Sequence, residues 1–111
     1  MRPFDLLQPT TAAEAIALAT DFNPGSSFCE SLPLVCSLAC TQLHLSPAEA
    51  LGACTVNAAH VLGRAGSIGR LARGYRADAV LVDASDWRYI AYHLGGPVVA
   101  ETIVGGQREL S

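Results

Sequence analysis

The sequence predicts an α/β fold in which an apolar segment and two helices are followed by a C-terminal β-segment. Apolar residues recur with helical spacing between residues 32 and 62, and a short aliphatic run at 79–82 is typical of a strand. A Gly-Gly pair near the end separates two further strand-like runs. The 111 residues are 50% hydrophobic and 15% charged, which suits one globular domain and excludes a disordered segment.

The N-terminal part combines an irregular stretch, an apolar run and a loop. Residues 1–15 form an atypical segment that contains two prolines and shows no clear period. From Ala12 to Thr20 the chain is almost entirely small and apolar, and such a short run is compatible with a helix or a buried strand. The next string carries the turn signals of a loop, Asp21-Phe22-Asn23-Pro24-Gly25-Ser26-Ser27.

Two helices are predicted between residues 32 and 62. The inner stripe of the first is expected to consist of Leu32, Val35, Cys36, Ala39 and Leu43. The second follows Ser46, which can cap it, with Pro47 in the first helical position and Glu49 placed to reach back to the cap. Its stripe is expected to consist of Leu51, Cys54, Ala58, Val61 and Leu62, with Gly63 as the end.

The last third reads as a β-segment with one aromatic insertion. Ser67-Ile68-Gly69 and Gly74-Tyr75 bracket a turn, and Ala79 to Val82 is a predicted buried strand that Asp83 closes. The segment with Trp87, Tyr89 and Tyr92 suits a short helix or an irregular stretch. A strand at 98–104, a turn at Gly105-Gly106 and a short strand at 107–110 complete the prediction. The chain thus divides into segments 1–15, 16–65 and 66–111.

Composition excludes several classes of function. Seven basic residues against ten acidic ones give a net charge of −3, which offers no electrostatic footprint for nucleic acid. No apolar run is long enough to span a membrane, and the N-terminus lacks a signal pattern, so we expect a cytoplasmic chain. The four cysteines form no C-x-x-C pair. Buried thiols in a reducing compartment are therefore favoured over a disulfide or a zinc site.

Asp21 is the candidate for chemistry. An apolar strand that ends in a carboxylate and continues into a Pro-Gly loop is the arrangement by which parallel barrel strands deliver residues to an active face. A carboxylate there can ligate a divalent metal and accept a proton from its bound water. The alternative is that Asp21 caps the turn, which spacing alone favours. The three histidines form no H-x-H pair and are expected to be structural or exposed.

A family resemblance rests on several strings of the sequence. Ala17-Leu18-Ala19-Thr20-Asp21-Phe22-Asn23-Pro24-Gly25-Ser26 resembles the last barrel strand and loop of the imidazolonepropionases, which belong to the metal-dependent amidohydrolase superfamily. The resemblance continues through Leu32-Pro33-Leu34-Val35, Leu38-Ala39-Cys40-Thr41, Ser46-Pro47-Ala48-Glu49-Ala50-Leu51 and Thr55-Val56-Asn57-Ala58-Ala59. The returning β-segment of the superfamily is similar to Gly66-Ser67-Ile68-Gly69 and Gly74-Tyr75-Arg76-Ala77-Asp78-Ala79-Val80-Leu81-Val82-Asp83.

This resemblance implies a fold and an activity. The fold would be the C-terminal fragment of an amidohydrolase TIM barrel, with the last barrel strand and its helices, followed by strands of the small β-sandwich domain. The activity would be the hydrolysis of 4-imidazolone-5-propanoate to N-formimidoyl-L-glutamate in histidine degradation, with a zinc or iron ion. Asp21 matches the metal ligand that also takes a proton from water. Asn23 and Gly25 match product contacts, and Ser26 matches a substrate contact.

The sequence also departs from the family pattern. The H-x-H metal pair, the later histidines and the substrate arginine of the family have no counterpart here. A complete barrel takes about 250 residues, so we expect this chain to be inactive alone. Three interpretations stay open: part of an imidazolonepropionase, with a homodimer as the assembly considered; a non-catalytic small α+β module or pseudoenzyme; and, less favoured, another hydrolase of cyclic amides.

Overall fold

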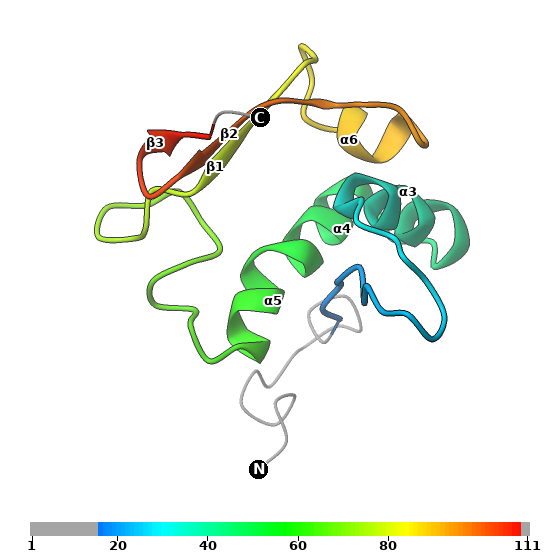
Figure 1. Cartoon of the computed structure of the whole chain (residues 1–111), viewed down its shortest axis with the longest axis horizontal. Coiled ribbons are helices and arrows are strands. Elements are labelled where there is room, and N and C mark those ends of the chain that lie inside the picture. Colours follow the sequence, from blue (N-terminus) through cyan, green and yellow to red (C-terminus); the bar gives the residue numbers. More distant parts are fainter. Residues whose placement is uncertain (1–15, 110–111) are drawn as a thin grey trace.

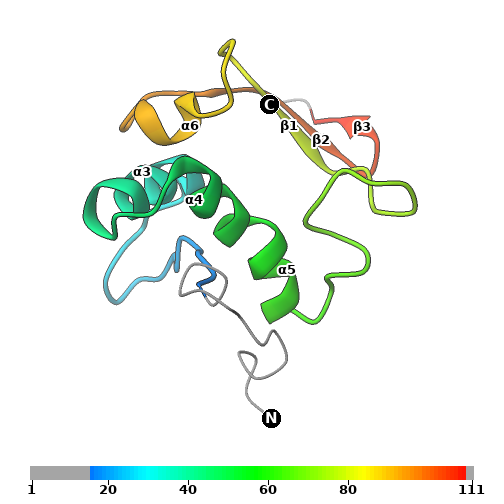
Figure 2. The same cartoon turned by 180° about the vertical axis from the view of Figure 1, so that it is seen from behind.

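The computed structural model describes residues 16–109, so the segment 1–15 and the end of the last predicted strand lie outside the described residues. Its elements are α3 (Leu32–Gln42), α4 (Pro47–Cys54), α5 (Val56–Val61), β1 (Ala79–Val82), α6 (Tyr89–Tyr92), β2 (Val99–Val104) and β3 (Gln107–Arg108). One layer consists of α3, α4 and α5, and the sheet together with α6 lies across from it (Figure 1). Seen from behind, a long connection from α5 to β1 joins the two layers (Figure 2). The predicted mixed α/β class is therefore confirmed.

Helix α3 forms where the sequence predicts the first helix. The hydroxyl of Ser31 accepts a hydrogen bond from the backbone N–H of Leu34, which satisfies one of the free donors of the first turn. Its buried residues are Cys36, Ser37 and Ala39, while Leu43 is 58% exposed. The predicted stripe is thus wrong at Leu43. This residue is the C-cap, one position past the end of α3, so it does not share the buried face of that helix.

The capping box predicted for the second helix is present. The Ser46 hydroxyl accepts from the N–H of Glu49 at 3.2 Å, and the Glu49 carboxylate accepts from the N–H of Ser46 at 3.0 Å. These reciprocal bonds lower the pKa of Glu49, chiefly through the backbone donor of Ser46. The predicted C-terminal signal is also confirmed, because Gly63 has φ 70° and closes α5 in a Schellman motif with Arg64.

The second helix is interrupted, which the sequence analysis did not predict. Thr55 has φ −118° and ψ −82°, and it separates α4 from α5. Its hydroxyl donates to the carbonyl of Leu51 at 2.7 Å, an interaction that bends helices. The residues buried in α4 and α5 are Ala50, Ala53 and Ala59. The predicted stripe is wrong at Val61 and Leu62, which are 46% and 67% exposed.

The segment 16–20 has no helix or strand of its own. It is held beside α4 and α5 by the Leu18 N–H, which donates to the Ala53 carbonyl, and by the Asn57 side chain, which donates to the Ile16 carbonyl. A parallel strand needs a neighbouring strand for its backbone groups, and none of residues 16–109 offers one here. Leu18 packs instead against the small core, whose buried members are Cys36, Ala39 and Ala50.

The three strands form an antiparallel sheet in the order β1-β2-β3. Ala79 pairs with Ile103 at one end of β1, and the register shifts between Leu81 and Val82. The predicted two-residue turn between β2 and β3 is confirmed, since Gly105 and Gly106 both adopt positive φ, which glycine allows without strain. The expected burial of β1 is wrong, because Leu81 is 50% exposed on a strand that forms the edge of the sheet.

Asp78 ties the start of β1 to this turn. Its carboxylate accepts from the N–H of Gly105 at 2.8 Å and from the Arg76 guanidinium at 2.9 Å. The backbone donor, followed by Arg76, lowers the pKa of Asp78. Asp78, which belongs to the string that resembles the superfamily, therefore holds the start of β1 to the Gly105-Gly106 turn. None of the helices within residues 16–109 has the length and apolar character needed to cross a membrane.

We expect Asp78→Asn to reduce the dependence of stability on pH. Because the pKa of Asp78 is lower in the folded chain than in the unfolded one, its stabilisation is complete above the unfolded pKa of about 4 and is lost as the pH falls through the folded value. Urea unfolding at pH 7 and pH 3 should show a smaller difference in midpoint for Asp78→Asn than for the wild type. Asp83→Asn controls for the loss of one charge at the other end of β1, and an equal effect of both variants would contradict this role.

Candidate functional site

The loop after residue 20 is closed by its own backbone. The Asn23 N–H donates to the Ser27 carbonyl at 2.8 Å, and the Ser27 N–H donates back to the Asn23 carbonyl at 3.3 Å. This pair brings the two ends of the Pro24-Gly25-Ser26 tip together. A proline-glycine sequence favours such a reversal, so the predicted loop is confirmed.

The side chain of Asn23 organises the tip. Its oxygen accepts from the N–H groups of Gly25 and Ser26, at 2.9 and 2.8 Å. Its NH₂ group donates to the carbonyl of Asp21 at 2.6 Å and to the hydroxyl of Ser26 at 3.0 Å. An asparagine supplies both the acceptor and the donors that this arrangement needs. Asn23 therefore caps the turn, and its amide group is engaged within the loop.

Asp21 has an unusual backbone and an exposed side chain. Its φ is 50°, in the left-handed region that few residues other than glycine adopt. Within residues 16–109, no hydrogen bond or ion pair engages its carboxylate. The alternative that Asp21 caps the turn therefore finds no support in these contacts. Residues other than glycine in the left-handed region cluster at active sites and ligand clamps, and aspartate adopts this region more readily than most residues do.

Gly25 and Ser26 lie at the tip of the loop, and Gly25 leaves little room for a larger side chain. A Cβ atom on Gly25 would lie 3.2 Å from the Asn23 side-chain oxygen, so a larger residue would crowd this hydrogen-bonding centre. Ser26 is exposed, and its hydroxyl contacts only the Asn23 amide among the described residues. The structure thus brings Asn23, Gly25 and Ser26 together, whereas Asp21 joins them through its carbonyl.

An aromatic pair flanks the loop, and the sequence did not predict it. The rings of Phe22 and Phe28 lie 5.4 Å apart and are tilted by 55°. They are 49% and 70% exposed, so the pair forms an apolar surface beside Asp21. The signal in the sequence was the position of one phenylalanine on each side of the Asn-Pro-Gly-Ser string.

The described residues do not assemble a metal centre. Within residues 16–109, no group of three or more His, Cys, Asp or Glu side chains is placed to hold an ion. His44 and His60 are exposed, as expected. The ring of His93 packs on the ring of Tyr89, with the two ring centroids 5.0 Å apart, and it lies against Gly96. A metal ion needs three or four protein ligands in a typical enzyme site, so Asp21 would supply only one of them and residues 16–109 do not complete the set.

We expect Asn23→Ala to loosen the tip of the loop. The change removes the acceptor for the N–H groups of Gly25 and Ser26. Each lost bond corresponds to about 1 kcal/mol, so the exchange of these two amide hydrogens should accelerate about 5- to 10-fold. Hydrogen exchange followed by NMR measures this rate. Ser26→Ala is the matched control, since it removes a hydroxyl and keeps the acceptor. Equal acceleration by both variants would contradict the role of Asn23.

Comparison with known proteins gives a consistent result. The model of the amidohydrolase family matches residues 10–108. The chain is 66% identical over 95 residues to the imidazolonepropionase of Rubrobacter xylanophilus, covering 86% of this chain and 23% of that protein. It is 49% identical over 96 residues to that of Chloroflexus aggregans and 48% identical over 93 residues to that of Solibacter usitatus. These matches cover 86% and 84% of this chain and 22% of each relative. The chain therefore spans less than a quarter of the length of these curated relatives.

Proposed function

Because this chain belongs to the amidohydrolase family, we propose that it is the part of an imidazolonepropionase-like hydrolase that carries the Asp21 loop. The reaction is the hydrolysis of 4-imidazolone-5-propanoate to N-formimidoyl-L-glutamate, and the 111 residues alone are inactive. The identity of 66% over 95 residues with a protein named imidazolonepropionase carries this proposal. The exposed carboxylate of Asp21, which no side chain within residues 16–109 engages, supports it.

In this proposal each loop residue has a distinct task. The Asp21 carboxylate accepts a proton from the attacking water, as a carboxylate within hydrogen-bond reach of that water can do. Asn23 and Gly25 contact the formimidoylglutamate product, and Ser26 contacts the imidazolone substrate. The hydrogen bonds of Asn23 hold the tip in one shape before the substrate arrives, so that little ordering is left for the binding step.

Only one of the ligands of a metal ion can be assigned among the described residues. Amidohydrolases are generally metal-dependent, and the resemblance points to zinc or iron, with Asp21 as a ligand. Residues 16–109 supply no further ligand group around it. The proposal therefore assigns one ligand to this chain and derives no step through the ion. The same proposal places residues 16–20 at the last strand of the barrel, takes a homodimer as the assembly and locates the protein in the cytoplasm. The four free thiols support the cytoplasmic location.

A graft tests the proposal. The segment 16–109 replaces the corresponding part of the Rubrobacter xylanophilus enzyme, and the turnover of 4-imidazolone-5-propanoate is compared with that of the parent. We expect turnover comparable to the parent from the graft and none from the 111-residue chain. A graft that folds with the thermal stability of the parent and has no turnover would sink the proposal.

The second candidate is a non-catalytic α+β module derived from an amidohydrolase. The observation that favours it is the lack of any metal-ligand group within the described residues. It predicts that the 111-residue chain unfolds cooperatively without metal, and that the graft is folded but inactive. The imidazolonepropionase proposal predicts an active graft, so a single assay separates the two.

A further inference from the structure

Two thiols from different helices meet where α3 packs against α4. The Sγ atoms of Cys36 in α3 and Cys54 at the end of α4 lie 3.3 Å apart and share a hydrogen bond. The residues are 18 positions apart in the chain, so packing of the helices brings them together. A disulfide needs an S–S distance of about 2 Å, so movement of roughly 1 Å would suffice.

We propose that Cys36 and Cys54 form an oxidation site, in which a hydroperoxide reacts with one of the two thiols and the product condenses with the other to a disulfide between α3 and α4. The proposal is independent of the hydrolase function, because it concerns two thiols outside the Asp21 loop. The sequence favoured buried, inert thiols for all four cysteines. That interpretation holds for isolated cysteines, whereas the contact between Cys36 and Cys54 creates a reactive pair.

The contact couples the ionisation of the two thiols. A hydrogen bond between the two sulfur atoms favours a thiolate on the accepting one, and it lowers the pKa of Cys36. The same bond, together with burial, raises the pKa of Cys54. Burial also raises the pKa of Cys40, the nearest other cysteine on α3. Since the thiolate is the nucleophile and either sulfur can be the donor, one thiol of the pair attacks the oxidant and its partner resolves the product.

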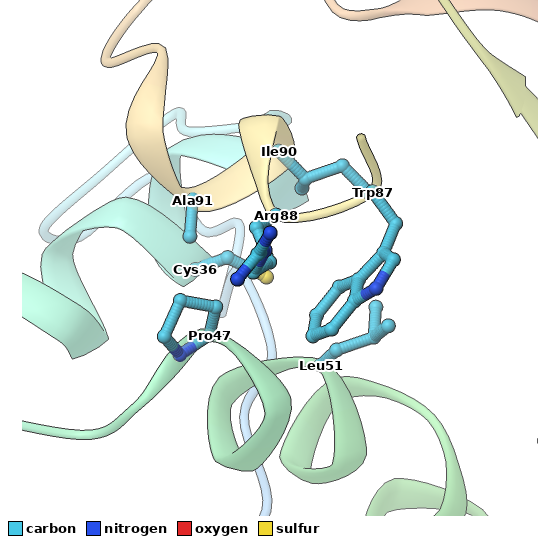
Figure 3. Close-up of a pocket in the computed structure, with 7 residues that line it drawn as sticks. All are labelled: Cys36, Pro47, Leu51, Trp87, Arg88, Ile90 and Ala91. Atoms are coloured by element: carbon cyan, nitrogen blue, oxygen red, sulfur yellow. The ribbon is translucent and has the colours of Figure 1, made fainter. Parts of the chain in front are cut away.

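Access to the pair is open on one side. On the side drawn in Figure 3, Cys36 lies among Pro47, Leu51 and the residues of α6, and the space beside it is only about 10 Å³. That volume holds about one water molecule. On the other side a cavity of about 450 Å³ lies between the helices and the sheet, and both Cys36 and Cys54 line it. Its other lining residues are mostly apolar, which suits a small, neutral oxidant.

The chemistry balances with a hydroperoxide as the oxidant. One of the two sulfur atoms attacks one peroxide oxygen, the O–O bond breaks, and the other oxygen leaves as water or an alcohol after taking a proton. That cysteine is then a sulfenic acid. The sulfur of the partner thiol attacks the sulfenic acid sulfur, the S–S bond forms, the S–O bond breaks, and water leaves with the proton of the partner thiol. Two thiols are oxidised by two electrons, and one peroxide is reduced.

Peptide mapping of the 111-residue chain tests the pairing. Hydrogen peroxide is added at equal concentration, remaining thiols are blocked, and the chain is cleaved after glutamate without reduction. Cleavage after Glu30 and Glu49 places Cys36 and Cys40 in one peptide and Cys54 in the next. We expect these two peptides to be linked in the wild type and equally in Cys40→Ser. A mixture of all possible pairings, or no linkage, would overturn the proposal.

The condensation step needs a second measurement. In Cys54→Ser and in Cys36→Ser the sulfenic acid on the remaining thiol has no resolving partner, and a 1,3-dicarbonyl probe should label it. In the wild type the partner thiol consumes the sulfenic acid, so labelling should be at least about 10-fold weaker. Labelling of the wild type equal to that of the single variants would refute the condensation. The wild-type map uses no substitution, so a folding defect of a variant leaves the pairing testable.

Discussion

Replacing Asp21 by alanine in the grafted enzyme is expected to lower the turnover of 4-imidazolone-5-propanoate by on the order of 10²–10⁴-fold, the usual contribution of a positioned general base. The change removes an exposed carboxylate that no other described side chain engages. The rest of the loop is held by Asn23, whose bonds to Gly25 and Ser26 do not involve that carboxylate. The loss should therefore fall mainly on kcat, with a smaller change in KM.

Two further substitutions separate the chemistry of Asp21 from its backbone. Asp21→Asn keeps the shape and tolerates a φ of 50°, and Asp21→Gly removes any strain at this φ; both lack the basic oxygen. All three variants should lose turnover to a similar extent. Glu30→Gln is the matched control, since Glu30 is an exposed carboxylate a short distance along the chain. If Asp21→Asn kept nearly full turnover, the role as a proton acceptor would be wrong.

The features that the sequence predicted correctly depend on neighbours in the chain. Ser46 and Glu49 form their capping box because the two residues lie three positions apart at a helix start, whatever surrounds them. The turn at Gly105 and Gly106 was predictable because both glycines can adopt the positive φ that it needs, although its amides also bond to Asp78 and Ala77. Local chemistry of this kind can be read from a few residues.

The features that the sequence did not predict depend on contacts that the period of apolar residues does not show. The break at Thr55 lies where its hydroxyl bonds to the Leu51 carbonyl four positions earlier, within a run of residues that would otherwise suit one continuous helix. The exposure of Leu81 follows from its position in an edge strand. The burial of Ala50 at 0% exposure reflects how closely α3 and α4 approach. None of these partners can be identified from the period of apolar residues.

The candidate site shows the same division. The loop and its tip were predicted, because proline and glycine determine a reversal locally. The cap was assigned to Asp21 as the alternative to a ligand role, yet the structure gives it to Asn23. Spacing does not distinguish these two residues, since both can hydrogen-bond to the backbone two residues ahead. The contact between Phe22 and Phe28 depends on the closure of the loop and so required the structure.

Gly69 anchors the long connection between α5 and β1 against the helix layer. Its φ is +96°, and a Cβ atom built on it would lie 2.8 Å from the Ala59 Cβ and 2.9 Å from the Thr55 carbonyl oxygen. The connection is closed further along by the Arg76 N–H, which donates to the Ser67 carbonyl at 2.8 Å. Gly69 is therefore a point of close backbone contact between the helices and the segment that leads to the sheet.

We expect Gly69→Ala to lower the free energy of unfolding by roughly 3 kcal/mol, because an alanine there combines a strained φ with a clash against backbone. Gly74→Ala has a φ of +86° with open space around the new Cβ, so it isolates the strain and should lose only about 1–2 kcal/mol. Gly52→Ala lies within α4 with nothing near the new methyl group, and it should stabilise by about 0.5–1 kcal/mol. Urea unfolding of the three variants measures this order. Equal losses for Gly69→Ala and Gly74→Ala would mean that the connection can leave Thr55 and Ala59 freely, and that this contact does not hold the sheet to the helices.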